Sequence, residues 1–576
     1  MDPAGGSPIG RPLSRSALFI AFIGIVFSLL PGVFLQAETS QSLDQLKQLS
    51  KTEHWEEVLR VAGSDPTSSA ERDFYIGNAL AHLGRWEEAR IAYLAGARIS
   101  PQEKRFPQEL AGVAFKQKQY SQAVRYLQRA LKLDTKDSYT LDFLGTLYFL
   151  EGNLEAALKY WNQIAKPRVE GVILEPAPRI DPAILDQTFA FSPKSTLRLS
   201  ELLSSEAAIR ELGIFPSFRF DLQAQNNESG SFDLVFRNSE KDGCGGRWEC
   251  LFSLFRGLPA QSVHPEFFNL WHRDINLLAF YRWDAQKRRV DAELSGPFSG
   301  NPKLRYHLLA DLRSENWNIR NSFTGPAPLL ASLNLRREAA SINFVTIVSG
   351  RWQWSAAAEL SYRDFRNVFS GMALSPNLLA TGYQLKQITR VDANIWRVPE
   401  RRLSIDSSAS SQLGRIWSNP YYTFEKLQGS LRLHWLPKAE GDDYEFLEQV
   451  RAGKTLGIIP FDELYTMGVL GDTDLLLRAH IATRDGRKGS APLGSDYFLS
   501  NWEVDKNVYQ HTPFAVKVGP FLDTGKITDT SSSLGSPKWL WDMGAQVKTK
   551  VFGMGVVFAY GKDLRSGNNA ITIRLQ

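Results

Sequence analysis

The amino-acid sequence predicts a multidomain chain with an all-α helical-repeat arm, a small α+β domain and a C-terminal transmembrane antiparallel β-barrel of about 16 strands. Three observations support this prediction. Small residues recur every 34 positions between residues 40 and 165, apolar and polar residues alternate from 265 to 576, and no segment after the N-terminus offers 18 consecutive apolar residues. Without a long apolar segment, a mature chain crosses a bilayer only as a barrel, because lipid offers no partners for unpaired backbone groups.

The composition is that of a folded chain, with 43% hydrophobic and 22% charged residues. Aromatic residues make up 12%, and 12 of the 15 tryptophans lie after residue 240. This skew favours aromatic anchoring at a membrane interface. The formal charge of +5 is spread over 67 basic and 62 acidic side chains, and no basic run indicates a nucleic-acid partner.

The N-terminus has the pattern of a secretory signal peptide, residues 1–37. Arg11 and Arg15 precede an apolar run from Ala17 to Leu30, and a small residue follows at Ala37. The run is shorter than the ~20 residues that a spanning helix needs. Cleavage near Ala37 is therefore expected, and an uncleaved anchor is the alternative.

Residues 40–165 contain internal repeats with a period of 34. Two sets of small residues show the spacing: Ala89, Ala123 and Ala157, and Gly77, Ala111 and Gly145. A large residue follows each of the three alanines by four positions, on the same helical face. The pattern resembles tetratricopeptide repeats, which implies stacked helices with a concave surface. That surface would bind a periplasmic protein partner or a passing peptide; a simple spacer is the alternative.

Residues 168–238 form a separate domain with the predicted order strand, helices, strand, strand. The segment Glu211–Phe215, followed by Phe218–Leu222, resembles a POTRA domain, in which a helix ends at glycine and leads into a strand. Phe232–Arg237 alternates as a strand with one buried face. The resemblance implies that extended substrates add a strand to the sheet edge. A generic α+β linker domain is the alternative.

Two cysteines, Cys244 and Cys250, lie in a linker at 239–264, within the segment Cys-Gly-Gly-Arg-Trp-Glu-Cys. A disulfide is the expected state in an oxidising compartment. Metal binding is the alternative, but His264 is a lone neighbour.

Catalytic motifs are not evident. The sequence holds no Gly-x-Ser-x-Gly elbow, paired-histidine metal motif or phosphate loop, and its eight histidines show no recognisable ligand spacing. We therefore expect no enzyme activity, no cofactor and no metal.

The barrel is expected over residues 265–576. Apolar and polar residues alternate in Leu304–Arg313, Leu431–Trp435 and Ile571–Gln576. A water-soluble sandwich would alternate in the same way, but the signal peptide and the aromatic content favour a membrane. About 310 residues, at roughly 10 per strand plus turns, fit about 16 strands.

Several patches of the barrel region occur in an order that resembles the BamA/TamA superfamily of outer-membrane assembly factors and its two-partner-secretion relatives. They are Phe267–Leu270 leading to Leu294–Phe298, then Phe461–Gly468 before Leu477–His480, and finally Phe521–Gly525. The resemblance implies an outer-membrane location with the N-terminal domains in the periplasm. Its implied partners are the lipid bilayer and unfolded or extended polypeptide clients.

The resemblance also implies a latch inside the barrel. The family's loop reads Val-Arg-Gly and an aromatic residue; here Ala479 stands for the glycine and His480 for the aromatic. The strand motif Phe-x-Asp-x-Gly is complete at Phe521, Asp523 and Gly525. Two further residues complete the expected site. Arg478 is expected to pair with Asp523 in the lumen, and Glu503, which has the same inward phase, to extend the pair. Ordinary solvated lumen charges are the alternative.

These expectations favour an outer-membrane assembly or polypeptide translocation factor. The alternative is an exopolysaccharide export porin, because such porins also join tetratricopeptide repeats to a barrel. A porin of that kind would lack the POTRA-like domain and the Arg478–Asp523 signature.

Overall fold

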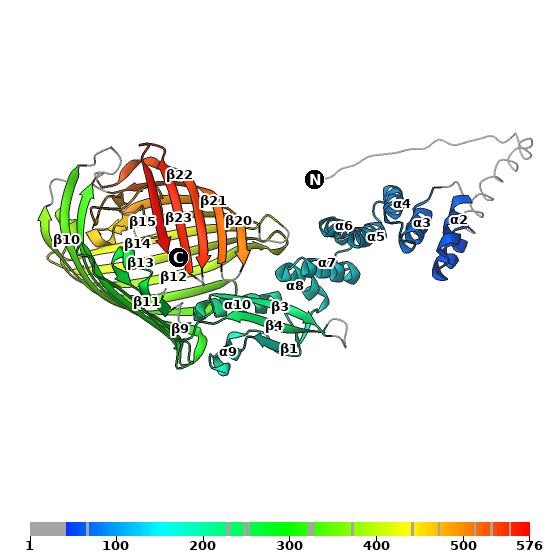
Figure 1. Cartoon of the computed structure of the whole chain (residues 1–576), viewed down its shortest axis with the longest axis horizontal. Coiled ribbons are helices and arrows are strands. Elements are labelled where there is room, and N and C mark those ends of the chain that lie inside the picture. Colours follow the sequence, from blue (N-terminus) through cyan, green and yellow to red (C-terminus); the bar gives the residue numbers. More distant parts are fainter. Residues whose placement is uncertain are drawn as a thin grey trace, which may run out of the picture. The chain divides into compact units, whose positions relative to one another are not determined.

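The structure is a computed structural model of the chain (Figure 1). It describes residues 42–64, 68–225, 231–245, 250–251, 254–320, 328–369, 374–438, 443–469, 473–511, 514–529, 534–551 and 554–575. The predicted signal peptide, residues 1–37, lies outside this set. The chain divides into two compact units, Met1–Thr140 and Leu141–Gln576.

Helices make up the N-terminal part of the chain. They are α2 (Trp55–Ser64), α3 (Ala70–His82), α4 (Trp86–Ile99), α5 (Arg105–Lys116), α6 (Tyr120–Leu133), α7 (Ser138–Leu150) and α8 (Leu154–Trp161). Among the described residues, no helix is both long and apolar enough to cross a membrane.

Glycines let the paired helices approach closely. A Cβ on Gly77 of α3 would lie 2.4 Å from the ring of Tyr93 on α4, and a Cβ on Gly145 of α7 would lie 2.4 Å from the ring of Trp161 on α8. The same contact thus recurs after two periods of 34 residues. The predicted helical-repeat arm is confirmed.

A small α+β domain follows. Its elements are β1 (Arg168–Glu175), α9 (Pro182–Thr188), β2 (Ser195–Thr196), α10 (Leu199–Leu212), β3 (Ser217–Ala224) and β4 (Ser231–Ser239). The strand order is β2-β1-β4-β3, with β1 parallel and β3 antiparallel to β4. The helix α10 ends at Gly213, whose φ of 72° favours glycine. Because β3 pairs with β4 alone in this sheet, it is an edge strand.

The C-terminal part is a closed β-barrel. Its short strands are β5 (Ser262–Val263), β6 (Glu266–Leu270), β7 (Ile275–Arg282), β17 (Thr483–Arg484), β18 (Arg487–Lys488) and β24 (Asn569–Leu575). Its long strands are β8 (Lys287–Phe298), β9 (Asn301–Arg320), β10 (Leu329–Ser349), β11 (Trp352–Phe369), β12 (Gly382–Val398), β13 (Leu403–Trp417), β14 (Tyr422–Trp435), β15 (Tyr444–Gly457), β20 (Asp496–His511), β21 (Phe514–Thr528), β22 (Ser536–Val551) and β23 (Met554–Asp563).

The described barrel has 18 strand segments, of which β5, β17 and β18 are only two residues long. The remaining 15 are close to the predicted number, and the antiparallel barrel is confirmed. Neighbouring strands pair antiparallel along the wall from β6 to β15 and from β20 to β24. The barrel closes where β24 meets β5.

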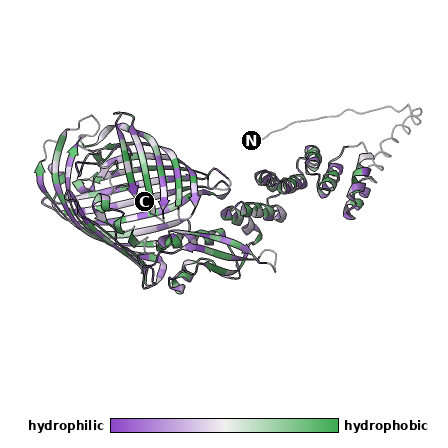
Figure 2. Cartoon of the chain, in the orientation of Figure 1, coloured by the Kyte–Doolittle hydropathy of each residue, from purple (hydrophilic) through white to green (hydrophobic). Residues whose placement is uncertain are grey.

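The barrel strands have two unlike faces, and Figure 2 shows apolar and polar residues alternating along them. On β21, Phe514 and Pro520 are exposed on the outer surface, whereas Phe521 and Asp523 are buried. This is the phase that the sequence predicts for that strand.

The α+β domain packs against one rim of the barrel. The backbone N–H of Gly350, in the β10–β11 turn, donates to Ser204 Oγ of α10 at 2.9 Å. A Cβ at Gly350 would lie 2.5 Å from the Cβ of Leu203, so only glycine fits there. At a neighbouring turn, the short helix η4 (Pro399–Arg401) contacts α8, where Tyr160 donates to Glu400 Oε1 at 2.9 Å. These contacts hold the domain at this rim.

The close approach of α3 and α4 can be tested by adding a single methyl group. We expect Gly77→Ala to destabilise the arm by about 1–3 kcal/mol, because the new Cβ overlaps the Tyr93 ring. Gly112→Ala on α5 is the matched control: nothing lies within 4 Å of its Cβ, so it should stabilise the helix by about 0.5–1 kcal/mol. Thermal unfolding followed by circular dichroism of the helical signal measures both. Equal melting temperatures for the two variants would contradict the packing.

Candidate functional site

One long loop, residues 458–495 between β15 and β20, carries the predicted arginine. It contains the short helix η5 (Phe461–Glu463) and the hairpin of β17 and β18. It lies inside the barrel, because its residues bond to buried side chains of β12, β9 and β21. The loop therefore crosses the lumen between opposite walls.

Arg478, near the loop tip, is fully buried. Its Nε and Nη2 donate to the two carboxylate oxygens of Asp523 on β21, at 2.9 and 2.6 Å. Its Nη1 donates to Glu503 Oε1 of β20 and to Gln546 Oε1 of β22, both at 2.7 Å. Its backbone N–H also donates to Asp523 Oδ2 at 3.0 Å. One guanidinium thus joins three adjacent strands in a bidentate, charge-assisted geometry.

The other residues of the Phe-x-Asp-x-Gly motif, Phe521 and Gly525, pack against Arg478 and the loop that carries it. The guanidinium carbon of Arg478 lies 3.9 Å from the ring centroid of Phe521, within the range of a cation–π contact. A Cβ on Gly525 would lie 2.7 Å from the sulfur of Met467 in the loop. In this strand motif, Phe521 packs its ring against the guanidinium and Asp523 accepts its hydrogen bonds. Gly525 leaves space for Met467 of the loop.

Further polar groups extend the network. Asn501 of β20 donates to Asp523 Oδ1 at 2.7 Å. Lys548 of β22 donates to Glu503 and to Asp505, each at 2.5 Å. The sequence analysis included Glu503 but missed Asn501, Lys548 and Gln546. Their inward phase on β20 and β22 is the signal that could have identified them.

The two loop residues that follow Arg478 also bond to the wall. The backbone N–H of Ala479 donates to Asp542 Oδ2 of β22 at 2.7 Å, and His480 Nδ1 lies 3.0 Å from the same oxygen. A Cβ on Gly561 of β23 would lie 3.0 Å from the carbonyl carbon of Arg478. The tip is thus packed directly onto β22 and β23.

The start of the loop is anchored on the opposite wall by η5. Glu463 accepts from Lys386 Nζ of β12 at 3.0 Å, and its Oε2 lies 3.3 Å from Lys426 Nζ of β14. Asp462 lies 2.9 Å from Arg363 Nε of β11 and 3.2 Å from Arg337 Nε of β10.

All of these charged groups are almost completely buried. Four cationic side chains from four strands therefore converge on two adjacent carboxylates, which the sequence analysis did not single out.

A third contact lies after the tip. Lys488 of β18 donates to Glu315 Oε1 of β9 at 2.6 Å, and both side chains are buried. The loop is therefore tied to the β10–β14 wall, to the β20–β23 wall and to β9.

Cys244 and Cys250 form a disulfide in the segment between β4 and β5. No other cysteine is present in the sequence.

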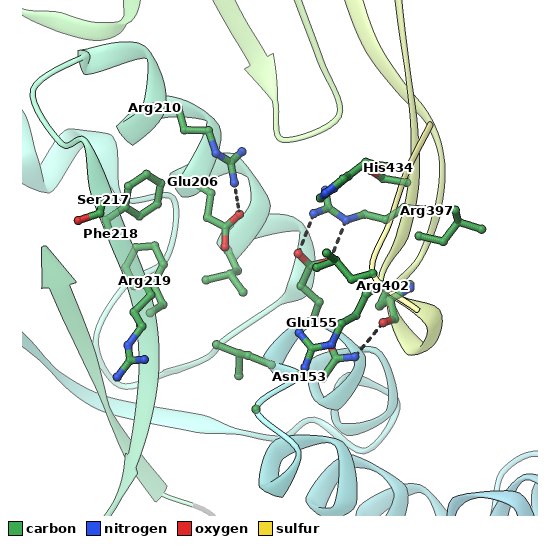
Figure 3. A pocket seen from close by; sticks show the side chains of 18 of the residues that line it. Asn153, Glu155, Glu206, Arg210, Ser217, Phe218, Arg219, Arg397, Arg402 and His434 are labelled. Carbon is green, nitrogen blue, oxygen red and sulfur yellow. Dashed lines mark hydrogen bonds and ion pairs between the residues drawn. The ribbon is translucent and has the colours of Figure 1, made fainter. Parts of the chain in front are cut away.

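A separate cavity of about 670 Å³ lies at the rim, between the α+β domain and the barrel (Figure 3). Ser217–Phe220 of the edge strand β3 line one side of it, and Arg397 and Arg402 line the other. Arg397 is held by Glu155 of α8 through two hydrogen bonds of 2.7 Å. Burial raises the pKa of Glu206 on the cavity wall.

Comparison with known proteins identifies the repeats. Residues 53–104 and 109–171 match the tetratricopeptide repeat family. No curated protein matches this chain.

Three solved structures show a low similarity to this chain. BamA from Haemophilus ducreyi lacking POTRA domains 1–3 is 12% identical, with a TM-score of 0.41, over 70% of this chain and 82% of that one. CdiB from Escherichia coli is 12% identical, with a TM-score of 0.46, over 71% and 76%. CdiB from Acinetobacter baumannii is 10% identical, with a TM-score of 0.44, over 71% and 73%.

The Arg478 contacts can be tested by loop accessibility. Arg478→Ala leaves the carboxylate of Asp523 buried without its cation, a loss that costs about 3–5 kcal/mol for a buried pair. We expect the loop to leave the wall, so that proteases cut between residues 470 and 495 of the detergent-solubilised variant but not of the wild type. Arg336→Ala is the control, because Arg336 pairs with Glu338 on an exposed part of β10. Equal protection of the loop in both variants would refute the anchoring.

The second anchor can be tested through conductance. Glu463→Gln removes the charge that Lys386 and Lys426 share, so we expect larger and noisier conductance in planar bilayers as the start of the loop detaches. Glu338→Gln on the exposed part of β10 is the matched control and should behave as the wild type. A conductance unchanged by Glu463→Gln would show that η5 does not hold the loop.

Proposed function

We propose that this chain is an outer-membrane β-barrel that inserts polypeptides into that membrane or passes them across it, with its helical arm and α+β domain in the periplasm. The observation that carries the proposal is the loop inside the barrel, held to the wall by the buried Arg478. A lumen crossed by an anchored loop suits a gated path for large clients more than an open pore for small solutes.

The outer surface of the barrel supports a lipid environment. On β22 and β23, Trp541, Met543, Phe558 and Tyr560 are between 42% and 50% exposed. On β24, Ile571 is 73% exposed. Large apolar side chains in such numbers would be unfavourable in water, and lipid would cover them.

The α+β domain supplies a surface for extended clients. The edge of β3 has backbone groups that no strand in the sheet pairs, and Ser217–Phe220 face the rim cavity (Figure 3). A client segment that adds to this edge would gain backbone hydrogen bonds with little demand on its sequence. The cavity then leads it to the barrel rim.

The place where the first and last strands of the barrel meet is suited to the release of a client sideways into the lipid. There β24, with seven residues, is followed in the barrel by β5 and then β6, with two and five residues, whereas β9 and β10 on the wall have 20 and 21. Fewer backbone hydrogen bonds can form between such short strands, so less free energy is needed to separate them. A client strand could pair there as it enters the lipid.

The loop argues against the export-porin alternative. Its contacts with β9, with β10–β14 and with β20–β23 cross the space that a polysaccharide would need. A porin would need that space to be clear along its whole length.

A client-insertion assay tests the proposed function. Purified wild-type protein in liposomes should accelerate the insertion of urea-denatured β-barrel clients, and Arg478→Ala should lower the rate by about 10-fold or more, because the gate loses its anchor. Arg336→Ala should retain the wild-type rate. Passage of an anionic polysaccharide without client insertion would instead support an export porin and refute the proposal.

A further inference from the structure

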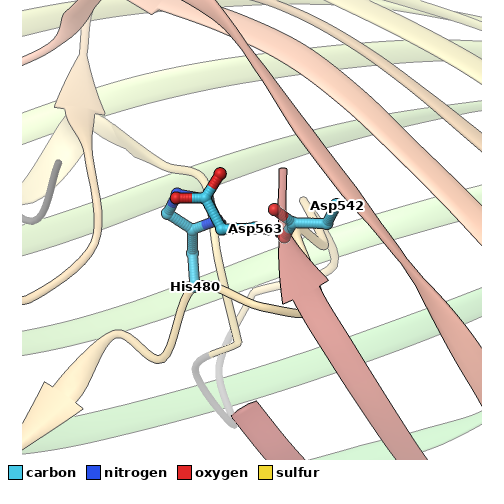
Figure 4. Close-up of side chains that lie close together, drawn as sticks. All are labelled: His480, Asp542 and Asp563. Carbon is cyan, nitrogen blue, oxygen red and sulfur yellow. Dashed lines mark hydrogen bonds and ion pairs between the residues drawn. The ribbon is translucent and has the colours of Figure 1, made fainter. Parts of the chain in front are cut away.

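Three potential metal ligands converge at the tip of the loop (Figure 4). They are His480 of the loop, Asp542 of β22 and Asp563 at the end of β23. One ligand atom from each lies within 4.8 Å of the other two. All three residues are buried, with exposed fractions of 5%, 0% and 3%.

The imidazole of His480 lies between the two carboxylates. His480 Nδ1 lies 3.0 Å from Asp542 Oδ2, and His480 Nε2 lies 3.8 Å from Asp563 Oδ2. In Figure 4, the carboxylate of Asp563 overlies the imidazole and that of Asp542 faces it from the side. The two aspartates are partners across the consecutive strands β22 and β23, whereas His480 comes from the loop before β20, which is why ligand spacing did not indicate the set.

One carboxylate oxygen of Asp542 is in a position to bind a ligand. Its Oδ2 accepts from the backbone N–H of Ala479. Its Oδ1 is buried, and no hydrogen bond from the described residues reaches it. Buried carboxylate oxygens are rarely left in this way, because burial without a partner costs free energy. A bound cation would satisfy this oxygen.

The charge at this point also favours a cation. Two buried carboxylates face one imidazole, and their net charge with a neutral imidazole is −2. Of the nearby cations, Arg478 is bonded to Asp523 and Glu503 instead, whereas Arg320 and Arg484 line the adjoining cavity. A divalent ion would balance the two carboxylates.

The surroundings hold the ligands in place and leave room for water. The backbone N–H of Arg565 and the hydroxyl of Ser566 donate to Asp563, at 2.9 and 2.5 Å. Such contacts orient metal ligands. His480 and Asp563 also line a cavity of about 400 Å³ that Ser490, Asn568 and Asn569 help to form. Water could complete the coordination there.

We propose that His480, Asp542 and Asp563 bind one divalent transition-metal ion and that this ion ties the loop tip to β22 and β23. Imidazole and carboxylate ligands suit Zn²⁺, and also Mn²⁺ or Fe²⁺, more than Ca²⁺, which prefers oxygen alone. The ion would be a second attachment of the tip beside Arg478. The proposal does not depend on polypeptide transport.

Equilibrium dialysis tests the site. The untagged, full-length protein is stripped with EDTA in detergent and dialysed against Zn²⁺, and the bound metal is counted by mass spectrometry. The wild type should bind one Zn²⁺ per chain, and His480→Ala and Asp563→Asn should each weaken binding by about 10-fold or more, as the loss of a ligand requires. His434→Ala is the control, because His434 pairs with Glu445 away from the tip.

A second readout separates the site from a folding defect. Co²⁺ bound to the wild type should give visible ligand-field absorption that His480→Ala abolishes, while both proteins keep the same protection of the loop from proteases in the absence of metal. Zn²⁺ binding that is equal in wild type and variants, or no binding by the wild type at millimolar Zn²⁺, overturns the proposal. In those cases His480 would act only as a hydrogen-bonding partner of Asp542. The Arg478 anchor and the transport proposal would remain unaffected by this outcome.

Discussion

A guanidinium buried out of reach of water is the constraint on which the lumen depends. Arg478 is fully buried, and a buried cation is tolerated only when it is paired and its donors are bonded. Asp523 meets this need with both oxygens, and Glu503 and Gln546 take the remaining donor. Such a pair adds little net stability over an apolar contact, yet leaving one partner alone is costly. It therefore fixes where the loop sits.

The fixed position of Arg478 also accounts for the course of the rest of the loop. With the tip held at β20–β22, the start of the loop reaches the far wall, where Asp462 and Glu463 meet cations of four strands. The return hairpin bonds to β9 through Lys488. The loop thus connects the walls, and these buried attachments together fix its position in the lumen. The short strands at the closure offer a route that leaves these attachments in place.

Much of this organisation follows from the sequence. The 34-residue spacing predicted the paired helices, because Gly77 and Gly145 must be small where Tyr93 and Trp161 cross. Alternation along β21 predicted that Phe521 and Asp523 face inward, and the loop motif indicated the arginine that meets them.

The remaining partners could not be predicted. Asp542 and Asp563 are partners across β22 and β23, but their approach to His480, like that of Gln546 to Arg478, depends on where the loop lies inside the barrel. Glu463 meets Lys386 and Lys426, which lie 77 and 37 residues away. Local patterns do not report such distant pairings, and the cluster of His480 with two aspartates was invisible for the same reason.

The most direct test of the central claim is a double-mutant cycle on the client-insertion rate, with Arg478→Ala, Asp523→Ala and the two combined. If the pair acts as one attachment, each single variant loses about as much as the other, and the combined variant loses no more than either. Losses that simply add would mean that the two residues act separately, and would contradict the account of a single buried pair that sets the position of the loop.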